Sequence, residues 1–246
     1  MHQTSERGPV TEADFMVNQV LRQALVRDGE GWLSEESADD LHRLKKHRVW
    51  VVDPLDGTRE FVARIPEWCV SVGLVENGRP IAGGICNPAT GEIFLGSAAT
   101  GLMCNGKRVR ASQKRDLAGA LVLASRTEVQ RGEWKQFEDT HLLIRPVGSV
   151  AYKLALVAAG LADATWTLTP KNEWDVAAGV ALVEAAGGFV QGLGNSRLTF
   201  NNGATCLSGL LAGGAHLRQQ LTSLIQRHKE THAYRVLAAN SEPRVP

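Results

Sequence analysis

The stretch that most constrains this chain runs from Val49 to Phe61 and reads V-W-V-V-D-P-L-D-G-T-R-E-F. Its first four residues are apolar and rich in β-branched side chains, which predicts a buried strand. Pro54 fixes its own φ and donates no backbone N–H, so we expect a central strand to stop there. Gly57 permits a backbone conformation closed to other residues, and Thr58 is suited to cap the element that follows.

The same stretch concentrates oxygen atoms at the end of the strand. Asp53 and Asp56 are separated by two residues, and the Leu55 carbonyl lies between them in the chain. Hard divalent cations prefer such oxygen ligands, and backbone N–H groups at a helix start bind phosphate. Asp, Pro and Gly are also the usual residues of a tight turn, so a turn without chemistry fits these residues equally well when they are taken alone.

The size of the chain allows one large domain or two closely packed lobes. With 246 residues it can bury a sizeable core. We expect a soft boundary near Lys114, with an N-terminal α+β lobe over 1–114 that carries most of the acids. A C-terminal α/β lobe would then occupy 115–246, because strand and helix patterns alternate there.

Charge and cysteine content indicate an ordinary cytoplasmic protein. The net charge is +1, with 22% charged and 43% hydrophobic residues, so there is no basic excess to suggest a nucleic-acid polymer as partner. The four cysteines are far apart and without metal-finger spacing, which predicts free thiols in a reducing cytoplasm. The first residues, M-H-Q-T-S-E-R-G-P, lack the apolar core of a signal peptide, and no apolar run reaches the roughly 18 residues of a membrane span.

Periodicity predicts the order of elements. For the first lobe we expect a helix over Thr11–Arg27, a short strand over Gly31–Ser34, a solvated turn or short helix over Asp39–Arg48, and a meander of strands at Cys69–Val75, Pro80–Cys86, Glu92–Gly96 and Gly101–Met103. For the second lobe we expect strands at Ala120–Ala124, Leu142–Val147, Asp163–Thr167 and near Phe189 and Cys206, helices at Glu128–Phe137, Ser149–Ala159, Asp175–Ala186 and Leu217–His228, and a loosely held tail from Glu230.

Other acidic residues lie next to the ends of predicted helices and strands, and each has a structural explanation of its own. Asp14 follows Thr11 at the spacing of a capping box, and Asp175 precedes an Ala-rich apolar run as an N-cap residue would. Glu35 and Glu36 follow the short strand. Buried carboxylates without cations are costly, however, so a metal site remains an alternative to the capping roles of these acids.

Four motifs in this order carry a family resemblance: T-E-A-D at Thr11–Asp14, S-E-E at Ser34–Glu36, D-P-L-D-G-T at Asp53–Thr58 and E-W-D-V-A-A-G at Glu173–Gly179. Together they resemble the inositol monophosphatase superfamily, which includes inositol monophosphatases, 3′(2′),5′-bisphosphate nucleotidases and, more distantly, fructose-1,6-bisphosphatases. The resemblance covers nearly the whole chain. It implies an α/β fold, a layered α-β-α-β-α sandwich, and usually a homodimer that hydrolyses small-molecule phosphomonoesters with Mg²⁺.

The resemblance also implies roles for individual residues. It assigns two or three Mg²⁺ ions to a ligand set made of Glu36, Asp53, the Leu55 carbonyl, Asp56 and Asp175. Asp53 would bridge two metals, and Glu35 is the alternative to its neighbour Glu36. Thr58, hydrogen-bonded to Asp14, would orient and help deprotonate the attacking water, while the backbone N–H groups of Gly57 and Thr58 would hold the phosphoryl oxygens. Lithium inhibition is expected from the family.

Branch-specific residues favour a nucleotidase. Thr58 is followed by R-E-F where the inositol-specific branch usually has Asn, and Leu168 stands where that branch has a ring-binding glutamate. Ser149 and Lys153 in G-S-V-A-Y-K are similar to the nucleotidases' substrate-side helix, although a surface lysine is an equal alternative for Lys153. The favoured reaction converts 3′-phosphoadenosine 5′-phosphate to AMP and phosphate. The alternatives are an inositol monophosphatase or a broad sugar-phosphate phosphatase, and, less favoured because every ligand is present, a non-catalytic binding protein of the same fold.

One departure concerns the start of the chain. Family members usually carry a long helix before the T-x-x-D motif, whereas only residues 1–10 precede Thr11 here. We expect apolar surface to be exposed on the first lobe as a result, and another subunit to cover it.

Overall fold

A computed structural model describes residues 11–228 of the chain. The larger of its sheets has seven strands in sequence order, with β1 parallel to β2 and every later neighbour antiparallel. These strands are β1 (Gly31–Ser34), β2 (Arg48–Asp56), β3 (Cys69–Glu76), β4 (Arg79–Asn87), β5 (Glu92–Ser97), β6 (Gly101–Cys104) and β7 (Lys107–Val109). The meander predicted from the sequence is therefore confirmed, with β7 as an additional short strand.

A second sheet of five strands has the order β12-β14-β10-β8-β9, and two further strands, β11 and β13, pair separately. Their bounds are β8 (Leu121–Ser125), β9 (Leu143–Val147), β10 (Ala164–Thr167), β11 (Lys171–Asn172), β12 (Gly188–Gly192), β13 (Cys206–Leu207) and β14 (Leu210–Gly214). Strand β14 lies inside the sheet, is buried throughout and was not predicted. The sequence did not indicate this strand because glycine and alanine, which make up much of it, have low strand propensity.

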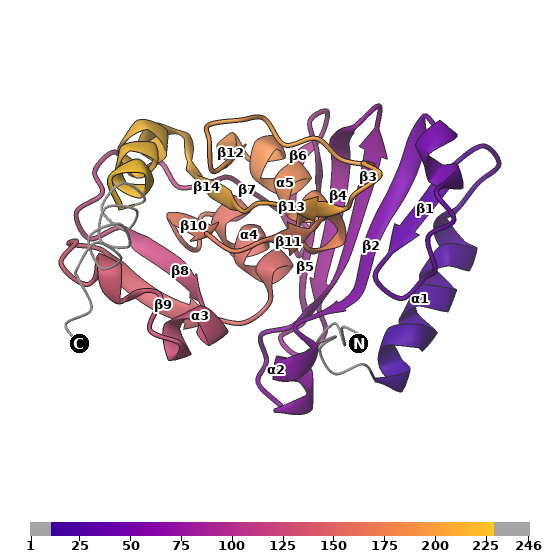
Figure 1. Cartoon of the computed structure of the whole chain (residues 1–246), viewed down its shortest axis with the longest axis horizontal. Coiled ribbons are helices and arrows are strands. Elements are labelled where there is room, and N and C mark those ends of the chain that lie inside the picture. Colours follow the sequence, from indigo (N-terminus) through magenta and orange to yellow (C-terminus); the bar gives the residue numbers. More distant parts are fainter. Residues whose placement is uncertain (1–10, 229–246) are drawn as a thin grey trace, which may run out of the picture.

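Helices form three layers around the two sheets (Figure 1). They are α1 (Glu12–Leu25), α2 (Thr58–Val62), α3 (Arg126–Gln130), α4 (Val150–Ala158), α5 (Glu173–Ala185) and a helix over 218–228, with 3₁₀ turns η1 (His42–Lys45), η2 (Lys135–Phe137) and η3 (Ala215–Leu217). Helix α1 covers the outside of the larger sheet, α4 and α5 lie between the sheets, and helix 218–228 covers the smaller sheet. The chain is thus an α/β protein with the predicted layered α-β-α-β-α sandwich.

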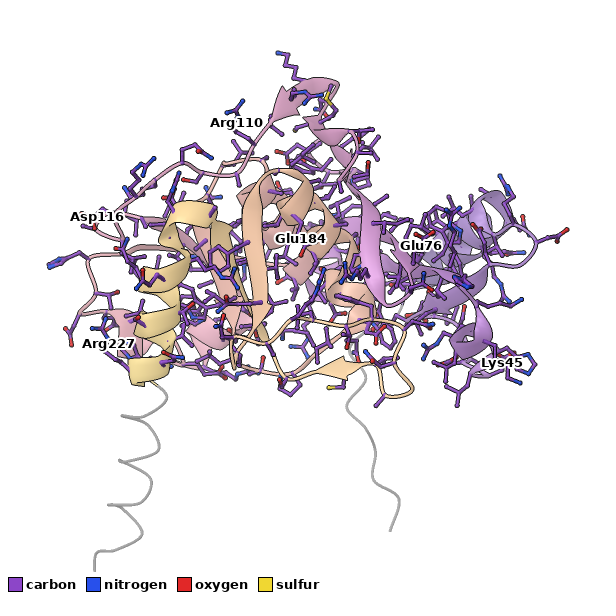
Figure 2. The ribbon with its side chains drawn as sticks, turned by 90° about the horizontal axis from the view of Figure 1, so that it is seen from above. Lys45, Glu76, Arg110, Asp116, Glu184 and Arg227 are labelled. Atoms are coloured by element: carbon purple, nitrogen blue, oxygen red, sulfur yellow. The ribbon has the colours of Figure 1, made fainter. Side chains whose placement is uncertain are left out.

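The layers follow one another along the length of the molecule. Seen from above in Figure 2, Lys45 of η1 and Arg227 of helix 218–228 lie at opposite ends. The two sheets fall on either side of Lys114, but one cluster of buried side chains draws on both, including Val51, Val75, Leu123 and Leu154. The division into lobes at that residue remains a prediction.

Helix α5 is pressed against the larger sheet, which places its first turn at the end of β2. A Cβ atom at Gly83 of β4 would lie 2.4 Å from the carbonyl oxygen of Ala178, so the helix backbone reaches the sheet only because this residue has no side chain. A second hydrophobic cluster lies under helix 218–228, where the rings of Trp134 and Trp166 stack with centroids 4.8 Å apart.

The solvated turn or short helix predicted over 39–48 is η1, and its residues are mostly exposed, apart from Arg43, which is buried and donates to Asp39 and to Asn201.

Two predictions about local structure were wrong. The helix expected over Glu128–Phe137 is α3 alone, followed by a turn at Gly132, whose φ of 76° interrupts the helix, and by η2. Strand β2 does not stop at Pro54: it continues to Asp56 with irregular pairing to β3, which accommodates a residue without a donor.

The expected tail from Glu230 lies outside the described residues. Within 11–228, no helix is both long enough and apolar enough to span a bilayer.

Candidate active site

A cavity of about 670 Å³ opens where the end of β2 meets the starts of α2, α4 and α5. All but one of the predicted site residues line it: Glu36, Asp53, Leu55, Asp56, Gly57, Thr58, Ser149, Lys153 and Asp175. The exception is Asp14, which is buried in the first turn of α1 and is not a lining residue in the part of the chain that the structure describes.

The end of β2 turns sharply into α2. The backbone N–H of Leu55 donates to the Asp53 carboxylate over 3.0 Å. The Thr58 hydroxyl donates to the Leu55 carbonyl over 3.1 Å. Gly57 has a φ of 97° and is the N-cap of α2, so Thr58 is the first helical residue and not the cap that was predicted.

The start of α4 holds Asp56. The hydroxyl of Ser149 donates to the Asp56 carboxylate over 2.7 Å, and the backbone N–H of Ala151 donates to the same oxygen over 2.6 Å. Ser149 is also the N-cap of α4, where its oxygen accepts from the N–H of Tyr152. Because the single proton of Ser149 goes to Asp56, the thiol of Cys69 is the donor in its 3.4 Å contact with that hydroxyl.

Two of the acids occupy equivalent places in capping boxes. Asp14 is the third residue of α1 and accepts from the N–H and hydroxyl of Thr11, over 2.7 and 2.6 Å. Asp175 is the third residue of α5, and its carboxylate accepts from the N–H of Asn172 over 2.9 Å. The capping box predicted at Asp14 is confirmed, whereas Asp175 is not itself the N-cap, because the helix begins two residues earlier.

The carboxyl groups of the cavity raise one another's pKa. Burial, followed by the charges of Asp56, Glu35 and Asp175, raises the pKa of Asp53 well above its usual range. Burial and the nearby charge of Asp56 raise the pKa of Asp175 to about 8. The pKa of Asp56 is raised by burial, although the hydrogen bonds from Ser149 and Ala151 counteract part of this effect. A compensating cation would relieve this strain.

The donor chemistry fits a hard divalent cation, although the side chains do not form a ready cage. Within the described range, no three acidic, histidine or cysteine side chains are gathered closely enough to hold an ion as they stand. Carboxylates and a backbone carbonyl are nevertheless the ligands that Mg²⁺ prefers, and these acids already interact through their charges.

The two adjacent glutamates, Glu35 and Glu36, both line the cavity. The charge of Glu35 raises the pKa values of Asp53 and Asp175. The backbone carbonyl of Glu36 accepts a hydrogen bond from the side-chain amide of Asn18 of α1 at 3.5 Å.

Three cations that were not predicted as site residues line the cavity: Arg59, Arg126 and Lys171. Arg126 forms an ion pair of 2.5 Å with Glu67, whose carboxylate also accepts from the N–H of Gly148 over 2.7 Å. Lys171 stands four residues before Asp175, and this charged position beside a recognised motif is the signal that could have identified it.

Comparisons with known proteins identify the family of this chain. A model of the inositol monophosphatase family matches residues 2–230. An inositol-1-monophosphatase of Mesorhizobium japonicum is 32% identical over 237 residues, which cover 92% of this chain and 86% of the relative. The structure of the Thermotoga maritima IMPase superposes with a TM-score of 0.77 at 27% identity, covering 93% of this chain and 87% of that one. That of CysQ from Bacteroides thetaiotaomicron, a bacterial member of the same family, gives 0.72 at 28% identity, covering 82% and 83%.

The fold, the clustered acids and these relatives define an enzyme, a metal-dependent phosphoric monoester hydrolase. The chain belongs to the inositol monophosphatase family. Members of this family depend on metal ions, typically Mg²⁺, and act on small phosphate esters.

Proposed function

We propose that the chain is a 3′(2′),5′-bisphosphate nucleotidase, which converts 3′-phosphoadenosine 5′-phosphate to AMP and phosphate. The observation that supports this most is the position of two branch-specific residues, Glu60 and Lys153, which line the same cavity as the clustered acids. Glu60 lies against Gly148, where an added Cβ would meet its Cγ at 2.4 Å. Both side chains are therefore within reach of a bound substrate.

The residues that would hold two or three Mg²⁺ ions are Glu36, Asp53, the Leu55 carbonyl, Asp56 and Asp175. Glu35 is the alternative to Glu36, and it is supported by its charge, which acts on Asp53 and Asp175. When bound, such ions supply a water of lowered pKa and an electrostatic clamp on the phosphoryl oxygens.

The remaining steps fall to side chains and backbone groups of this chain. Thr58 and Asp14 are proposed to orient the attacking water and accept its proton. Among the described residues the two do not bond to each other: Thr58 donates to Leu55 and Asp14 accepts from Thr11, so each must change partner. The N–H groups of Gly57 and Thr58, at a helix start, would hold the phosphoryl oxygens, and Ser149 and Lys153 would contact the substrate.

An inositol monophosphatase, or a broad sugar-phosphate phosphatase, is the second candidate. It is favoured by relatives named inositol-1-monophosphatase, including the one from Mesorhizobium japonicum. Leu168, one of the markers that pointed to nucleotidases, packs against the second hydrophobic cluster and does not line the cavity. Leu168 therefore indicates only that a ring-binding glutamate is absent, and it makes no contact with the cavity itself.

The deciding experiment is phosphate release with Mg²⁺, measured side by side on 3′-phosphoadenosine 5′-phosphate and inositol 1-phosphate, with EDTA as the control. Clear preference for the nucleotide supports the proposal. Preference for the inositol ester would replace it with the second candidate while leaving the metal site in place. Lithium should inhibit the favoured reaction, as is typical of the family.

We also propose that this enzyme acts in the cytoplasm as a homodimer. Phe15, Met16 and Val20 on α1 are 56%, 61% and 64% exposed, which leaves an apolar face on the outside of the larger sheet. Size-exclusion chromatography with light-scattering detection would measure the molar mass of the wild type and of Met16→Glu. The wild type should have the mass of a dimer, and a monomeric mass for both proteins would contradict the proposal.

A further inference from the structure

The cavity is lined by cations as well as by acids. Arg59 of α2 lines it, and three further cations come from the second half of the chain: Arg126 opens α3, Lys153 lies in α4 and Lys171 lies in β11. The acids at the end of β2 come from the first half. The cavity therefore combines a metal-binding end with a set of positive side chains.

These three cations are close enough to act on the same neighbours. Burial raises the pKa of Glu60, and the charges of Lys153 and Arg126 both act to lower it. Among the charges that act on Lys153, that of Asp56 is the largest, followed by those of Glu128, Lys171 and Glu60; Glu128 belongs to α3 beside Arg126. The three positive charges thus form one group within the cavity.

Lys171 and Arg126 are each held by a partner. The Lys171 ammonium donates to the Thr169 hydroxyl over 3.1 Å and lies 3.9 Å from the buried carboxylate of Glu128. Arg126 bonds to Glu67 through Nη2 over 2.5 Å, and its side chain is still 31% exposed where it lines the cavity. A guanidinium fixed on one side by a carboxylate is suited to bind an anion through its exposed side.

Lys153 is the most deeply buried of the three. The residue is 3% exposed, and the hydrogen bond that the structure gives its ammonium is a long one of 3.4 Å to the Val147 carbonyl. An ammonium group has three donors, and a buried cation is costly unless an anion pairs with it.

Three cations exceed what a simple monoester requires. The phosphate that is cleaved would lie at the acid end, where bound metal ions balance its charge. A neutral polyol attached to it would bring no charge to Arg126, Lys153 and Lys171. A second phosphate would, and it would also provide acceptors for their unused donors.

Building on the proposed function, we infer that Arg126 and Lys171, together with Lys153, bind a second phosphate of the substrate and select small bisphosphorylated esters over monophosphates. Arg126 and Lys171 are thereby assigned as specificity-determining residues. The scissile ester remains at the acid end of the cavity.

The kinetic test compares two substrates that share the scissile ester. 3′-Phosphoadenosine 5′-phosphate carries the second phosphate, and adenosine 3′-monophosphate lacks it. The wild type should prefer the bisphosphate. Lys171→Met and Arg126→Met should each lower kcat/KM for the bisphosphate by about tenfold to a hundredfold, mainly through KM, because each removes a charge-assisted contact. The preference over the monophosphate should shrink by a similar factor.

A matched control removes the same charge elsewhere. Lys45 is exposed on η1 at the far end of the molecule, so Lys45→Met should leave both substrates unaffected. Equal hydrolysis of both substrates by the wild type, or an equal loss on both in the two variants, would overturn the inference while the phosphatase assignment stands. Thermal unfolding of each variant, with Lys171→Gln as a milder change, shows that any loss is not due to misfolding.

A binding experiment separates this inference from the proposed reaction. In EDTA, titration calorimetry should show that AMP, which carries the second phosphate alone, binds the metal-free protein more tightly than adenosine does. Lys171→Met and Arg126→Met should weaken AMP binding by about tenfold. Such a result supports the subsite even if hydrolysis of the nucleotide is not observed, and equal binding of AMP and adenosine refutes it.

Discussion

The carboxylate of Asp56 and the hydroxyl of Ser149 are joined by a hydrogen bond of 2.7 Å, although the two residues are 93 positions apart in the chain. This bond fixes the end of β2 to the first turn of α4, and the N–H of Ala151 reinforces it over 2.6 Å. The acid at the centre of the cavity is thus oriented by the helix that also carries Lys153.

Replacing Asp56 by Asn should abolish turnover and leave the fold intact. The change removes one ionised ligand from the acid cluster, and it also removes a charge whose burial strains the metal-free protein. Phosphate release should fall below about a tenth of the wild-type rate, a loss of more than about 1.4 kcal/mol of transition-state stabilisation. A variant that keeps more activity than this, with an unchanged circular dichroism spectrum, would contradict the role of Asp56.

Removing the Ser149 hydroxyl should impair the enzyme through Asp56. Ser149→Ala loses both the bond to Asp56 and the cap of α4, which costs about 1 kcal/mol of stability. Ser149→Gly loses the same hydroxyl but relieves the φ of 53°, so it should unfold less easily than the alanine variant. Both variants should require more Mg²⁺ for half-maximal activity. Wild-type Mg²⁺ dependence in both would show that the hydroxyl serves α4 alone.

The metal-free protein should lose stability as the pH rises. The pKa of Asp175 is about 8 in the folded state against an ordinary value of 3.8, and the pKa values of Asp53 and Asp56 are raised as well. The folded state therefore retains protons that the unfolded state releases, so this contribution is present below the unfolded pKa and lost as the pH rises through the folded pKa.

Thermal unfolding in EDTA between about pH 5 and pH 8 measures this effect. The midpoint should fall with pH in the wild type and fall less steeply in Asp175→Asn, which cannot ionise. Added Mg²⁺ should restore more stability at the higher pH. Parallel slopes for the two proteins would show that Asp175 does not titrate in this range.

Close contact between β4 and α5 should make Gly83 intolerant of a side chain. A Cβ there would lie 2.4 Å from the Ala178 carbonyl oxygen, and so either the helix or the strand must move. Gly83→Ala should cost about 1–3 kcal/mol of unfolding free energy and reduce activity, because α5 carries Asp175. Gly203→Ala, where nothing lies within 4 Å of the added atom, is the matched control and should change stability by less than about 0.5 kcal/mol. Equal denaturation midpoints for the two variants would contradict this account.

Local signals predicted much of the fold correctly. Asn77-Gly78 and Asn105-Gly106 form turns with positive φ at both residues, because these are the residues that adopt this conformation most readily. Strand alternation and the Thr11–Asp14 capping box are equally local, since each depends on residues a few positions apart. Strand β14 was not predicted because its glycine and alanine residues have low strand propensity, and its place in the sheet depends on β10 and β12, which are distant in the chain.

The sequence by itself determined the order of the elements and the set of acids that could form a site. These follow from periodicity, turn residues and motifs, which are properties of short segments. Only the tertiary structure decided that Ser149 would hold Asp56, that the charge of Glu35 would act on the acid cluster, and that Arg126 and Lys171 would enter the same cavity. Distance and burial determine those relationships, and both arise only when the two sheets and their helices pack together.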